Sequence, residues 1–470
     1  MKHTNFPYKH AHLVGVKGVA MSALAVYLND CGVKVTGSDI ADDFPTKEEL
    51  DRARIPVSVG FDASRMTGKQ APDVVYYTGA HNGRDNVEVV AAREAGIPVF
   101  PHGQALGMIM QGTRQIVVSG SHGKTTTSAM VAVLLSRAGS EPSWAIGCGS
   151  INGLGAAGRK GKGSFFIAEG DEYVTDPGHD QTPRFLWLVP EILIVTNIDF
   201  DHPDAYADLA QVQAAFTKLQ EKSTTVVCNA DDANSRVLLG KQNVVTFGFS
   251  PNAEYQITHV GVGNGRMFFT LHERGVSLGE FSLKVPGRHN VLNAVAAMVS
   301  AHIAGVGWDV LKEGITGFTG TKRRFEALPG STDTLRFYDD YAHHPTEIAA
   351  TLKAARSWYP SSRIIAVFQP HTYSRTKTLL KEFGACFSDA DTVILTDIYA
   401  SAREHDTLGI TGMTLVNELS PHHKEVHFAK DQNAVATLLR TLSNHDTVVM
   451  FMGAGDIYNW EHDVIREVTL

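Results

Sequence analysis

The sequence has little cysteine and no long apolar run. Its 470 residues include four cysteines, which lie far apart and form no Cys-x-x-Cys pair: Cys31, Cys148, Cys228 and Cys386. We therefore expect no disulfide framework, but thiols in a reducing compartment, for which the cytoplasm is the simplest choice. No apolar stretch reaches the roughly 18 residues of a membrane span, and residues 1–9 are too polar for a signal peptide.

A surplus of positive charge is also absent. Lys and Arg number 42 against 50 Asp and Glu, which gives a formal net charge of −8 and argues against a nucleic-acid surface. The composition, 43% hydrophobic and 20% charged, is typical of a globular protein, and the length suffices for two to four domains. We expect small-molecule partners, no nucleic acid and no membrane, and a monomer or weak homodimer.

The most specific pattern is the run Gly-Ser-His-Gly-Lys-Thr-Thr-Thr at residues 120–127. A strand is predicted before it at 115–119, and an Ala/Val/Leu-rich helix after it at 128–138. Glycine lets backbone N–H groups approach phosphate oxygens, Lys124 brings a positive charge, and Thr125 offers a hydroxyl to Mg²⁺. This is the short form of a phosphate loop, because Val118 stands where the longer form has glycine. An ordinary Gly-rich turn is the alternative.

Carboxylate and histidine side chains follow the strands predicted beside this loop. Glu169 ends the strand at 164–168, and residues 197–202, which include His202, follow the strand at 191–196. A neighbouring strand end is where a nucleotide hydrolase places its Mg²⁺ ligand. Each acid could also cap a helix, but the two strand ends together favour a metal site. Further on, Asn293 in the helix at 291–305 lies on a solvated face or contacts an adenine edge.

The first segment predicts a second nucleotide-like site. A strand at 12–16, a turn with Gly15 and Gly18, a helix at 20–29 and a strand at 33–37 form a βαβ unit. Asp39 follows about 20 residues after the glycine turn, as the ribose-binding acid of dinucleotide folds does; a turn-forming role is the alternative. Strands at 74–77 and 97–100 also end in polar residues, where open parallel sheets bind ligands.

The last segment predicts a third α/β unit without a phosphate loop of its own. It follows a Gly-rich link at 314–320 and a basic cluster at 322–324. Strands at 335–338, 363–368, 392–395 and 448–451 end in polar residues, among them His343, His344, His371 and Arg375. These groups could bind carboxylates or complete a site from across a cleft. A lone histidine at a strand end is more often a capping residue, but their density here favours a site.

Taken together, these motifs resemble the Mur ligases, the ATP-dependent amide-forming enzymes of peptidoglycan assembly, along nearly the whole chain. The similarity lies in residues 120–127, 168–169, 197–202, 289–293 and 323–326. It implies an α/β fold with a Rossmann-like N-terminal domain (1–112) that binds a UDP substrate, a P-loop ATPase-like central domain (113–321) and a Rossmann-like C-terminal domain (322–470) that binds an amino acid.

Within the family, the run Phe-Gln-Pro-His-Thr-Tyr-Ser-Arg-Thr at 368–376 indicates the branch that joins L-alanine to UDP-N-acetylmuramate through an acyl phosphate. The alternative is the branch that attaches a recycled tripeptide to the same sugar nucleotide, which residues 176–184 resemble more closely. The first loop also departs from the family, since Lys17 stands where a glycine is usual.

The resemblance implies roles for individual residues. ATP would be bound by Gly120, Ser121, His122, Gly123, Lys124, Thr125, Thr126, His289, Asn293, Arg324 and Asp340. The UDP substrate would be bound by Gly15, Gly18, Ser38, Asp39, Thr78, Asn82 and His102. The amino acid would be bound by Tyr341, His343, His371 and Arg375. Mg²⁺ or Mn²⁺ would be held by Thr125, Glu169 and His202. The catalytic set would be Lys124, Glu169, His202, His343 and Arg375.

Overall fold

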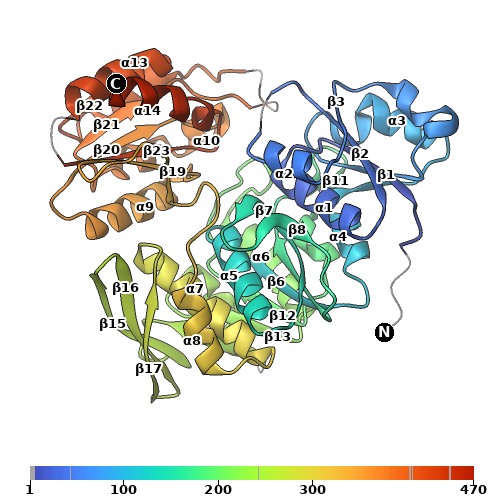
Figure 1. The fold of residues 1–470 in the computed structure, drawn as a ribbon, viewed down its shortest axis with the longest axis horizontal. Helices are drawn as coiled ribbons and strands as arrows, with labels where there is room; N and C mark the ends of the chain where they lie inside the picture. The colour runs from blue at the N-terminus through green and yellow to red at the C-terminus, as the bar shows by residue number, and fades with distance from the viewer. Residues whose placement is uncertain (1–5, 43, 242, 402–403, 405, 444–445) are drawn as a thin grey trace.

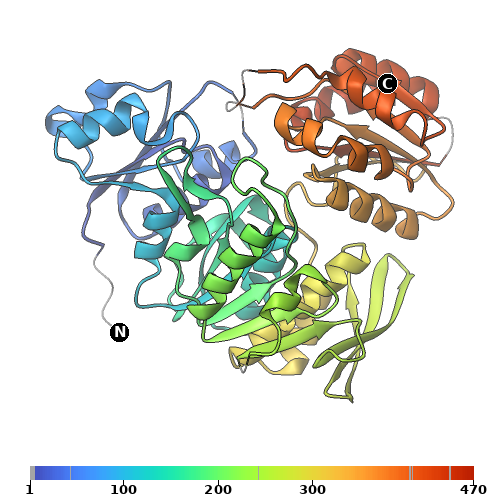
Figure 2. The ribbon, with the colours of Figure 1, turned by 180° about the vertical axis from the view of Figure 1, so that it is seen from behind.

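The computed structural model describes residues 1–470 except 1–5, 43, 242, 402–403, 405 and 444–445. Three α/β units follow one another along the chain, and each is built on its own sheet (Figure 1). The N-terminal and C-terminal units lie side by side over one end of the middle unit, as the view from behind also shows (Figure 2).

The N-terminal unit is a five-stranded parallel sheet with the order β3-β2-β1-β4-β5. Its strands are β1 (His10–Val14), β2 (Lys34–Asp39), β3 (Val57–Val59), β4 (Val74–Tyr77) and β5 (Val99–Pro101). Its helices are α1 (Val19–Asp30), α2 (Lys47–Arg52), α3 (Val87–Glu94) and α4 (His102–Ile109). Because the strands are parallel, the polar residues that follow them meet at one edge of the sheet.

The middle unit has a ten-stranded sheet in the order β17-β16-β15-β14-β13-β12-β6-β9-β7-β8. Its strands are β6 (Arg114–Ser119), β7 (Ser143–Ile151), β8 (Gly155–Arg159), β9 (Phe165–Gly170), β12 (Ile192–Val195), β13 (Thr225–Asn229), β14 (Val244–Gly248), β15 (Tyr255–Gly263), β16 (Arg266–Glu273) and β17 (Val276–Leu283). A separate hairpin joins β10 (Val174–Asp176) and β11 (Asp180–Pro183). The helices are α5 (Lys124–Arg137), α6 (Leu209–Glu221), α7 (Arg288–Ile303) and α8 (Trp308–Thr316).

The C-terminal unit has a six-stranded sheet in the order β18-β19-β23-β20-β21-β22. Its strands are β18 (Glu326–Ala327), β19 (Leu335–Asp340), β20 (Arg363–Phe368), β21 (Thr392–Leu395), β22 (Val426–Phe428) and β23 (Thr447–Met452). Its helices are α9 (Pro345–Trp358), α10 (Tyr373–Thr378), α11 (Leu380–Ala385), α12 (Gly412–Leu419), α13 (Gln432–Leu442) and α14 (Glu461–Thr469). All strand pairs except β18–β19 are parallel.

The hydrophobic cores divide the molecule differently from the sheets. One continuous core runs from the N-terminal unit into the middle unit, whereas the C-terminal unit has two cores of its own. Helix α1 packs on β7 and β8 so closely that a Cβ on Gly158 would lie 1.9 Å from the carbonyl oxygen of Ala23. Shared apolar burial therefore joins the first two units, whereas the contacts described below between the middle and C-terminal units are polar.

The α/β fold predicted from the sequence is confirmed, and two of its expectations need correction. Helix α5 begins at Lys124, not at residue 128, so the Thr run forms its buried first turn. Residues 314–316, predicted as part of a Gly-rich link, end helix α8. The strands β7 and β8 had no prediction, since Gly interrupts their apolar pattern.

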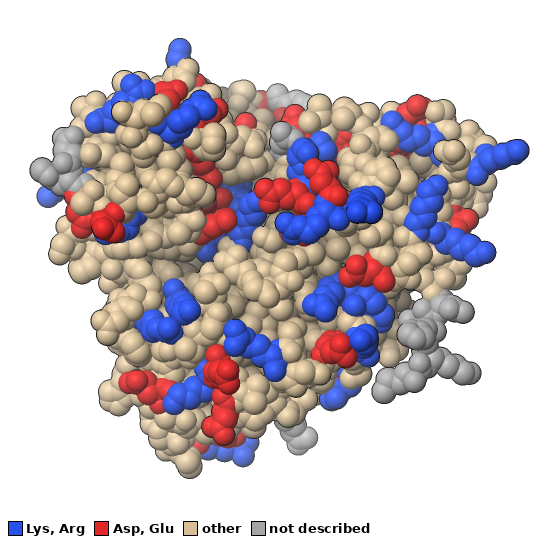
Figure 3. Space-filling model, in the orientation of Figure 1, with Lys and Arg blue, Asp and Glu red and all other residues tan. Residues whose placement is uncertain are grey.

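No helix among the described residues is both long and apolar enough to cross a membrane. On the face drawn in Figure 3, basic and acidic side chains are interspersed, and both kinds lie in the depression between the C-terminal unit and the other two.

Candidate functional site

The phosphate loop, residues 120–127, connects β6 to α5 at the carboxyl edge of the middle sheet. Gly123 has φ +83° and precedes the helix, and a Cβ there would lie 2.7 Å from Oδ1 of Asn293. Lys124 Nζ donates to the carbonyl oxygens of Gly120 (2.7 Å) and Ser121 (3.2 Å). The Lys124 side chain thus folds back onto its own loop. The N–H groups of this loop and the N-terminus of α5 favour the binding of a phosphate there.

Lys124 also donates to Glu172, a carboxylate that had no predicted role. Its Nζ lies 2.8 Å from Oε2 of Glu172, whose side chain is 1% exposed. Burial alone would lower the pKa of Lys124, but Glu172 and Asp171 raise it above its ordinary value. Sequence patterns place Glu172 near a strand end, but its partner lies 48 residues away and only the fold brings the two together.

Glu169, one of the predicted metal ligands, lies beside the loop at the end of β9. Its Oε1 accepts the N–H of Gly147 (2.8 Å), and the Thr125 hydroxyl also bonds to this carboxylate. Burial raises the pKa of Glu169, and a nearby cation would stabilise its charged form. A hydroxyl and a buried carboxylate suit the oxygen preference of Mg²⁺, so these two residues fit the ion.

His202, the third predicted metal ligand, is grouped with other acids. Its Nε2 lies 3.6 Å from Asp201 and 3.9 Å from Glu172. Of the side chains that the structure describes, Glu172, Asp201 and His202 form one of the groups compact enough to hold an ion, and Glu169 is not a member. His202 therefore lies next to the Lys124–Glu172 pair.

The predicted ATP residues beyond the loop line a cavity of about 310 Å³ between the middle and C-terminal units. His289 and Asn293 come from α7, Arg324 from the segment between the units, and Asp340 from the end of β19. Burial lowers the pKa of His289 to about 4 and raises that of Asp340 to about 6. Segments far apart in the sequence thus converge at the loop.

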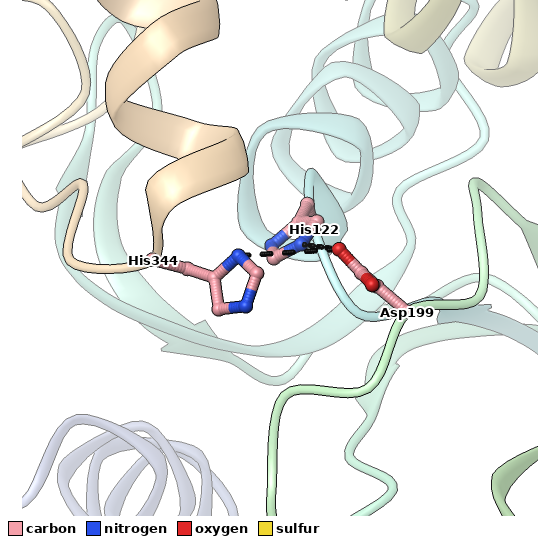
Figure 4. Close-up of side chains that lie close together, drawn as sticks. All are labelled: His122, Asp199 and His344. Carbon is pink, nitrogen blue, oxygen red and sulfur yellow. Dashed lines mark hydrogen bonds and ion pairs between the residues drawn. The ribbon is translucent and has the colours of Figure 1, made fainter. Parts of the chain in front are cut away.

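Three further side chains meet where the loop faces α9 (Figure 4). His122 Nε2 lies 3.1 Å from Asp199 Oδ2, and His344 Nδ1 lies 3.9 Å from the same oxygen. These residues form the other group that could hold a cation within the described part of the chain. His122 was predicted at the ATP site. Asp199 belongs to the run 197–202 and His344 to the polar residues after the strand at 335–338, but no prediction grouped these two residues with His122.

The predicted amino-acid residues gather at the carboxyl edge of the C-terminal sheet. Arg375 donates from Nη2 to Oδ1 of Asp201 in the middle unit (3.0 Å), and its Nη1 lies 3.5 Å from Nδ1 of His371. The rings of His343 and His371 are 6.1 Å apart, and those of Tyr341 and His343 are 5.2 Å apart. The four residues therefore form one cluster that faces the middle unit.

The side chain of His343 is a neutral imidazole at neutral pH. Burial lowers its pKa to about 4. Its Nδ1 lies 3.0 Å from the carbonyl oxygen of Tyr341, which assigns the proton to Nδ1 and leaves Nε2 as the acceptor atom.

In the N-terminal unit, several predicted UDP residues make internal contacts. Asp39 accepts the N–H groups of Lys17 (2.7 Å) and Ile40 (2.8 Å), and Ser38 is fully buried with its hydroxyl bonded to Glu88. The other predicted positions lie along the same edge of the sheet: Gly15, Gly18, Thr78, Asn82 and His102. Gly15 has φ +79°, and a Cβ there would lie 2.3 Å from Cγ2 of Thr78.

The unusual loop at residues 176–184 includes the hairpin turn between β10 and β11, and it docks on the N-terminal unit. Asp176 Oδ2 accepts from Tyr77 Oη (3.2 Å) and Arg84 N (3.1 Å), and His179 Nε2 lies 2.7 Å from Asp85. A Cβ on Gly83 would lie 2.1 Å from Asp176 Oδ1. Arg184, at the end of this loop, donates from Nη1 to Asp171 of the middle unit (2.8 Å). The contacts of Asp176 and His179 are with the N-terminal unit, not with the amino-acid cluster.

Each of the three units matches a different domain model of one protein family. Residues 10–114 match the model of the Mur ligase family, catalytic domain, residues 118–301 the Mur ligase middle domain, and residues 323–455 the Mur ligase, glutamate ligase domain. Similar relatives include the UDP-N-acetylmuramate–L-alanine ligases of Desulfitobacterium hafniense (39% identity; 96% of this chain, 98% of the relative) and Caldanaerobacter subterraneus (38%; 98% of each).

Solved structures agree with this similarity. The UDP-N-acetylmuramate–alanine ligase of Thermotoga maritima superposes with a TM-score of 0.81 at 28% identity, over 98% of both chains. A murein peptide ligase of Psychrobacter arcticus shares the fold, with a TM-score of 0.72 at 21% identity, over 98% of this chain and 99% of its own. On the strength of its full-length relatives, the chain belongs to the Mur ligase family.

Proposed function

We propose that the chain joins L-alanine to the carboxylate of UDP-N-acetylmuramate, with ATP converted to ADP and phosphate through an acyl-phosphate intermediate. The full-length relatives that carry this name support the reaction. The supporting geometry is one polar network that runs from Lys124 through Glu172, His202 and Asp201 to Arg375, with separations of 2.8, 3.9, 3.6 and 3.0 Å. This network connects the phosphate loop with the residues predicted to bind the amino acid, which supports one shared site.

The first step brings the γ-phosphoryl group to a carboxylate, so two anions must approach. Lys124 would stabilise the charge that develops on the transferred group, and Arg324 would contact the phosphate chain from the other side of the cavity. Thr125 and Glu169, with His202 nearby, would hold Mg²⁺ or Mn²⁺. The ion would supply further charge neutralisation between the two anions.

The second step brings the amine of L-alanine to the acyl phosphate. Arg375 already binds one oxygen of a carboxylate, Oδ1 of Asp201, and a guanidinium can bind the α-carboxylate of an amino acid through two parallel N–H donors. His343 at neutral pH is uncharged, so its Nε2 could accept a proton as the ammonium group becomes a nucleophilic amine. The N-terminal unit would hold the UDP group at the carboxyl edge of its sheet.

The acceptor panel tests this function. Phosphate release would be measured with UDP-N-acetylmuramate, ATP, Mg²⁺ and, in turn, L-alanine, glycine, L-serine or the tripeptide of peptidoglycan recycling. We expect release with L-alanine. Release with the tripeptide and none with L-alanine would establish the alternative ligase instead. We also propose a cytoplasmic location and a monomer or weak homodimer, which cell fractionation and light scattering would test.

A further inference from the structure

Glu347, in the first turn of α9, is a buried carboxylate without a role in the steps above. Its side chain is 11% exposed and lies among three basic groups from different parts of the chain. His122 Nδ1 of the phosphate loop is 3.2 Å from Oε1, Arg324 Nη1 is 3.9 Å from Oε1, and His343 Nδ1 is 3.3 Å from Oε2. One carboxylate therefore contacts residues of both the predicted ATP set and the predicted amino-acid set.

The two oxygens of Glu347 have different partners. Oε2 accepts the backbone N–H groups of His343 (3.1 Å) and His344 (3.4 Å), which forms a capping box at the start of α9. Oε1 is the oxygen nearest His122 and Arg324. Capping needs only a hydrogen-bond acceptor, and glutamine supplies one at this position as well as glutamate does. The negative charge is therefore not required for the helix start.

The charge state supports a function for the other oxygen. Burial alone would raise the pKa of Glu347, but His343, His122 and Arg324 hold it well below its usual range. His122 is similarly affected: burial would lower its pKa, and Asp199 and Glu347 raise it to about 10. At neutral pH an imidazolium of the loop thus faces an ionised carboxylate of the C-terminal unit.

A second contact fixes this arrangement. The hydroxyl of Thr346 donates to Oδ2 of Asp199 (3.1 Å), the oxygen that also pairs with His122. The first turn of α9 therefore contacts the middle unit through adjacent residues, Thr346 and Glu347. A shift of the phosphate loop would change both contacts together.

We propose that Glu347 is a positioning residue, which couples occupation of the phosphate loop to the orientation of the amino-acid cluster through His122, Arg324 and His343. The inference rests on the proposed function, since it assumes that ATP and an amino acid bind on either side of this carboxylate. ATP phosphates near His122 and Arg324 compete for the same positive charges that now face Glu347. The carboxylate and His343 respond as one unit, because Oε2 of Glu347 accepts the backbone N–H of His343.

The experiment compares the protein with Glu347→Gln, which keeps a capping acceptor and removes the charge. L-Alanine would be titrated calorimetrically in saturating UDP-N-acetylmuramate, with and without a non-hydrolysable ATP analogue. We expect the analogue to strengthen binding to the unaltered protein by about 5- to 150-fold, a usual range for coupled sites, and by less than about twofold in E347Q. E347Q should stay folded, with a somewhat lower melting temperature, because His122 loses one of its two carboxylate partners. A coupling ratio unchanged in E347Q overturns the inference.

Two variants make the result specific. Asp431→Asn replaces a carboxylate that caps α13 in the same unit, where Oδ1 accepts the N–H of Ala434 (2.9 Å), and it should keep the full ratio. His122→Asn removes the loop partner of Glu347. The double variant with E347Q should lose no more coupling than E347Q alone. Additive losses would contradict a shared path. If the acceptor panel selects another amino acid, that acceptor replaces L-alanine here, so the two proposals fail separately.

Discussion

Two glycine turns of this molecule are similar in sequence but differ in the charged groups that surround them. In the N-terminal unit, β1 turns at Gly15 into α1; in the middle unit, β6 turns at Gly120–Gly123 into α5. Each turn carries a lysine that folds back on backbone carbonyl oxygens. Lys17 Nζ donates to Ile40 (2.7 Å) and Asp42 (2.6 Å), and Lys124 Nζ donates to Gly120 and Ser121.

The difference lies in what faces each turn. Lys124 has Glu172 and, through it, a network that reaches the C-terminal unit, whereas Lys17 bonds to the loop that follows β2. Asp39, which pattern alone would assign to a ribose, holds the Lys17 N–H in place. A glycine turn therefore indicates where a ligand can approach, but the charged groups across from it decide whether chemistry follows.

The largest contrast should come from the two lysines. Lys124→Ala should lower kcat by about 10²- to 10³-fold or more, because it removes the ammonium charge that would stabilise the transferred phosphoryl group. Lys17→Ala, the matched change in the other turn, should change kcat by less than about threefold. Phosphate-release assays on both variants, with circular dichroism to check folding, would measure this. Comparable losses in the two variants would remove the distinction between the turns.

Arg375→Lys should distinguish the proposed role of the amino-acid cluster from that of the N-terminal unit. Lysine cannot form the two-pronged pair, so kcat/KM for L-alanine should fall about 100-fold, while KM for UDP-N-acetylmuramate stays within about twofold. Arg363→Lys is the control, since Arg363 pairs with Glu425 (2.7 Å) elsewhere in the same unit. Steady-state kinetics with each substrate varied would test this, and a rise in the UDP-substrate KM alone would contradict the assignment.

Substitution of the glycines in the two turns should have smaller effects. Gly15→Ala and Gly123→Ala both place a side chain at positive φ, and each should destabilise the fold by about 1–3 kcal/mol in chemical denaturation. Gly123→Ala also pushes on Asn293, so it should raise KM for ATP by about tenfold. Gly15→Ala pushes on Thr78 and should raise KM for the UDP substrate instead. An equal effect of both variants on the KM for ATP would contradict this pairing.

The smallest effects concern stability at the two ends of the pH range. Burial would raise the pKa of Glu88, but His12, Ser38 and the Asp62 N–H lower it to about 2, so its contribution is present above about pH 4.5 and is lost as pH falls toward 2. His122, with its pKa raised to about 10, contributes below about pH 6.5, and this contribution is lost as pH rises through 10.

Unfolding free energies measured from pH 3 to 10 would test these signs. Glu88→Gln should flatten the acid side of the profile by about 1–3 kcal/mol and leave the alkaline side unchanged, and His122→Asn should do the reverse. A variant that flattened both sides would show that the two networks do not titrate independently.

A feature of this fold can be predicted from the sequence when the residues that form it are close together along the chain. The βαβ units were predicted within a few residues, since apolar strands and a capped helix such as α9 depend on neighbouring residues. Helix α5 starts earlier than predicted because its Thr-rich first turn is stabilised by burial, which overrides the low helix propensity of threonine. The glycine-rich β7 and β8 owe their place to packing against α1, which local pattern cannot show.

The phosphate loop was determined by the sequence itself, because glycines, lysine and threonine act there as consecutive residues on one turn. The charged partners of that loop were decided by tertiary structure alone. Glu172 meets Lys124 across 48 residues, and Asp201 meets Arg375 across 174. Whether such a carboxylate is a solvated surface group or a buried partner depends on desolvation and on which opposite charge the fold brings within a few ångströms. Glu347 is the clearest case, since its position at a helix start is local, whereas its contacts with His122 and Arg324 exist only in the folded chain.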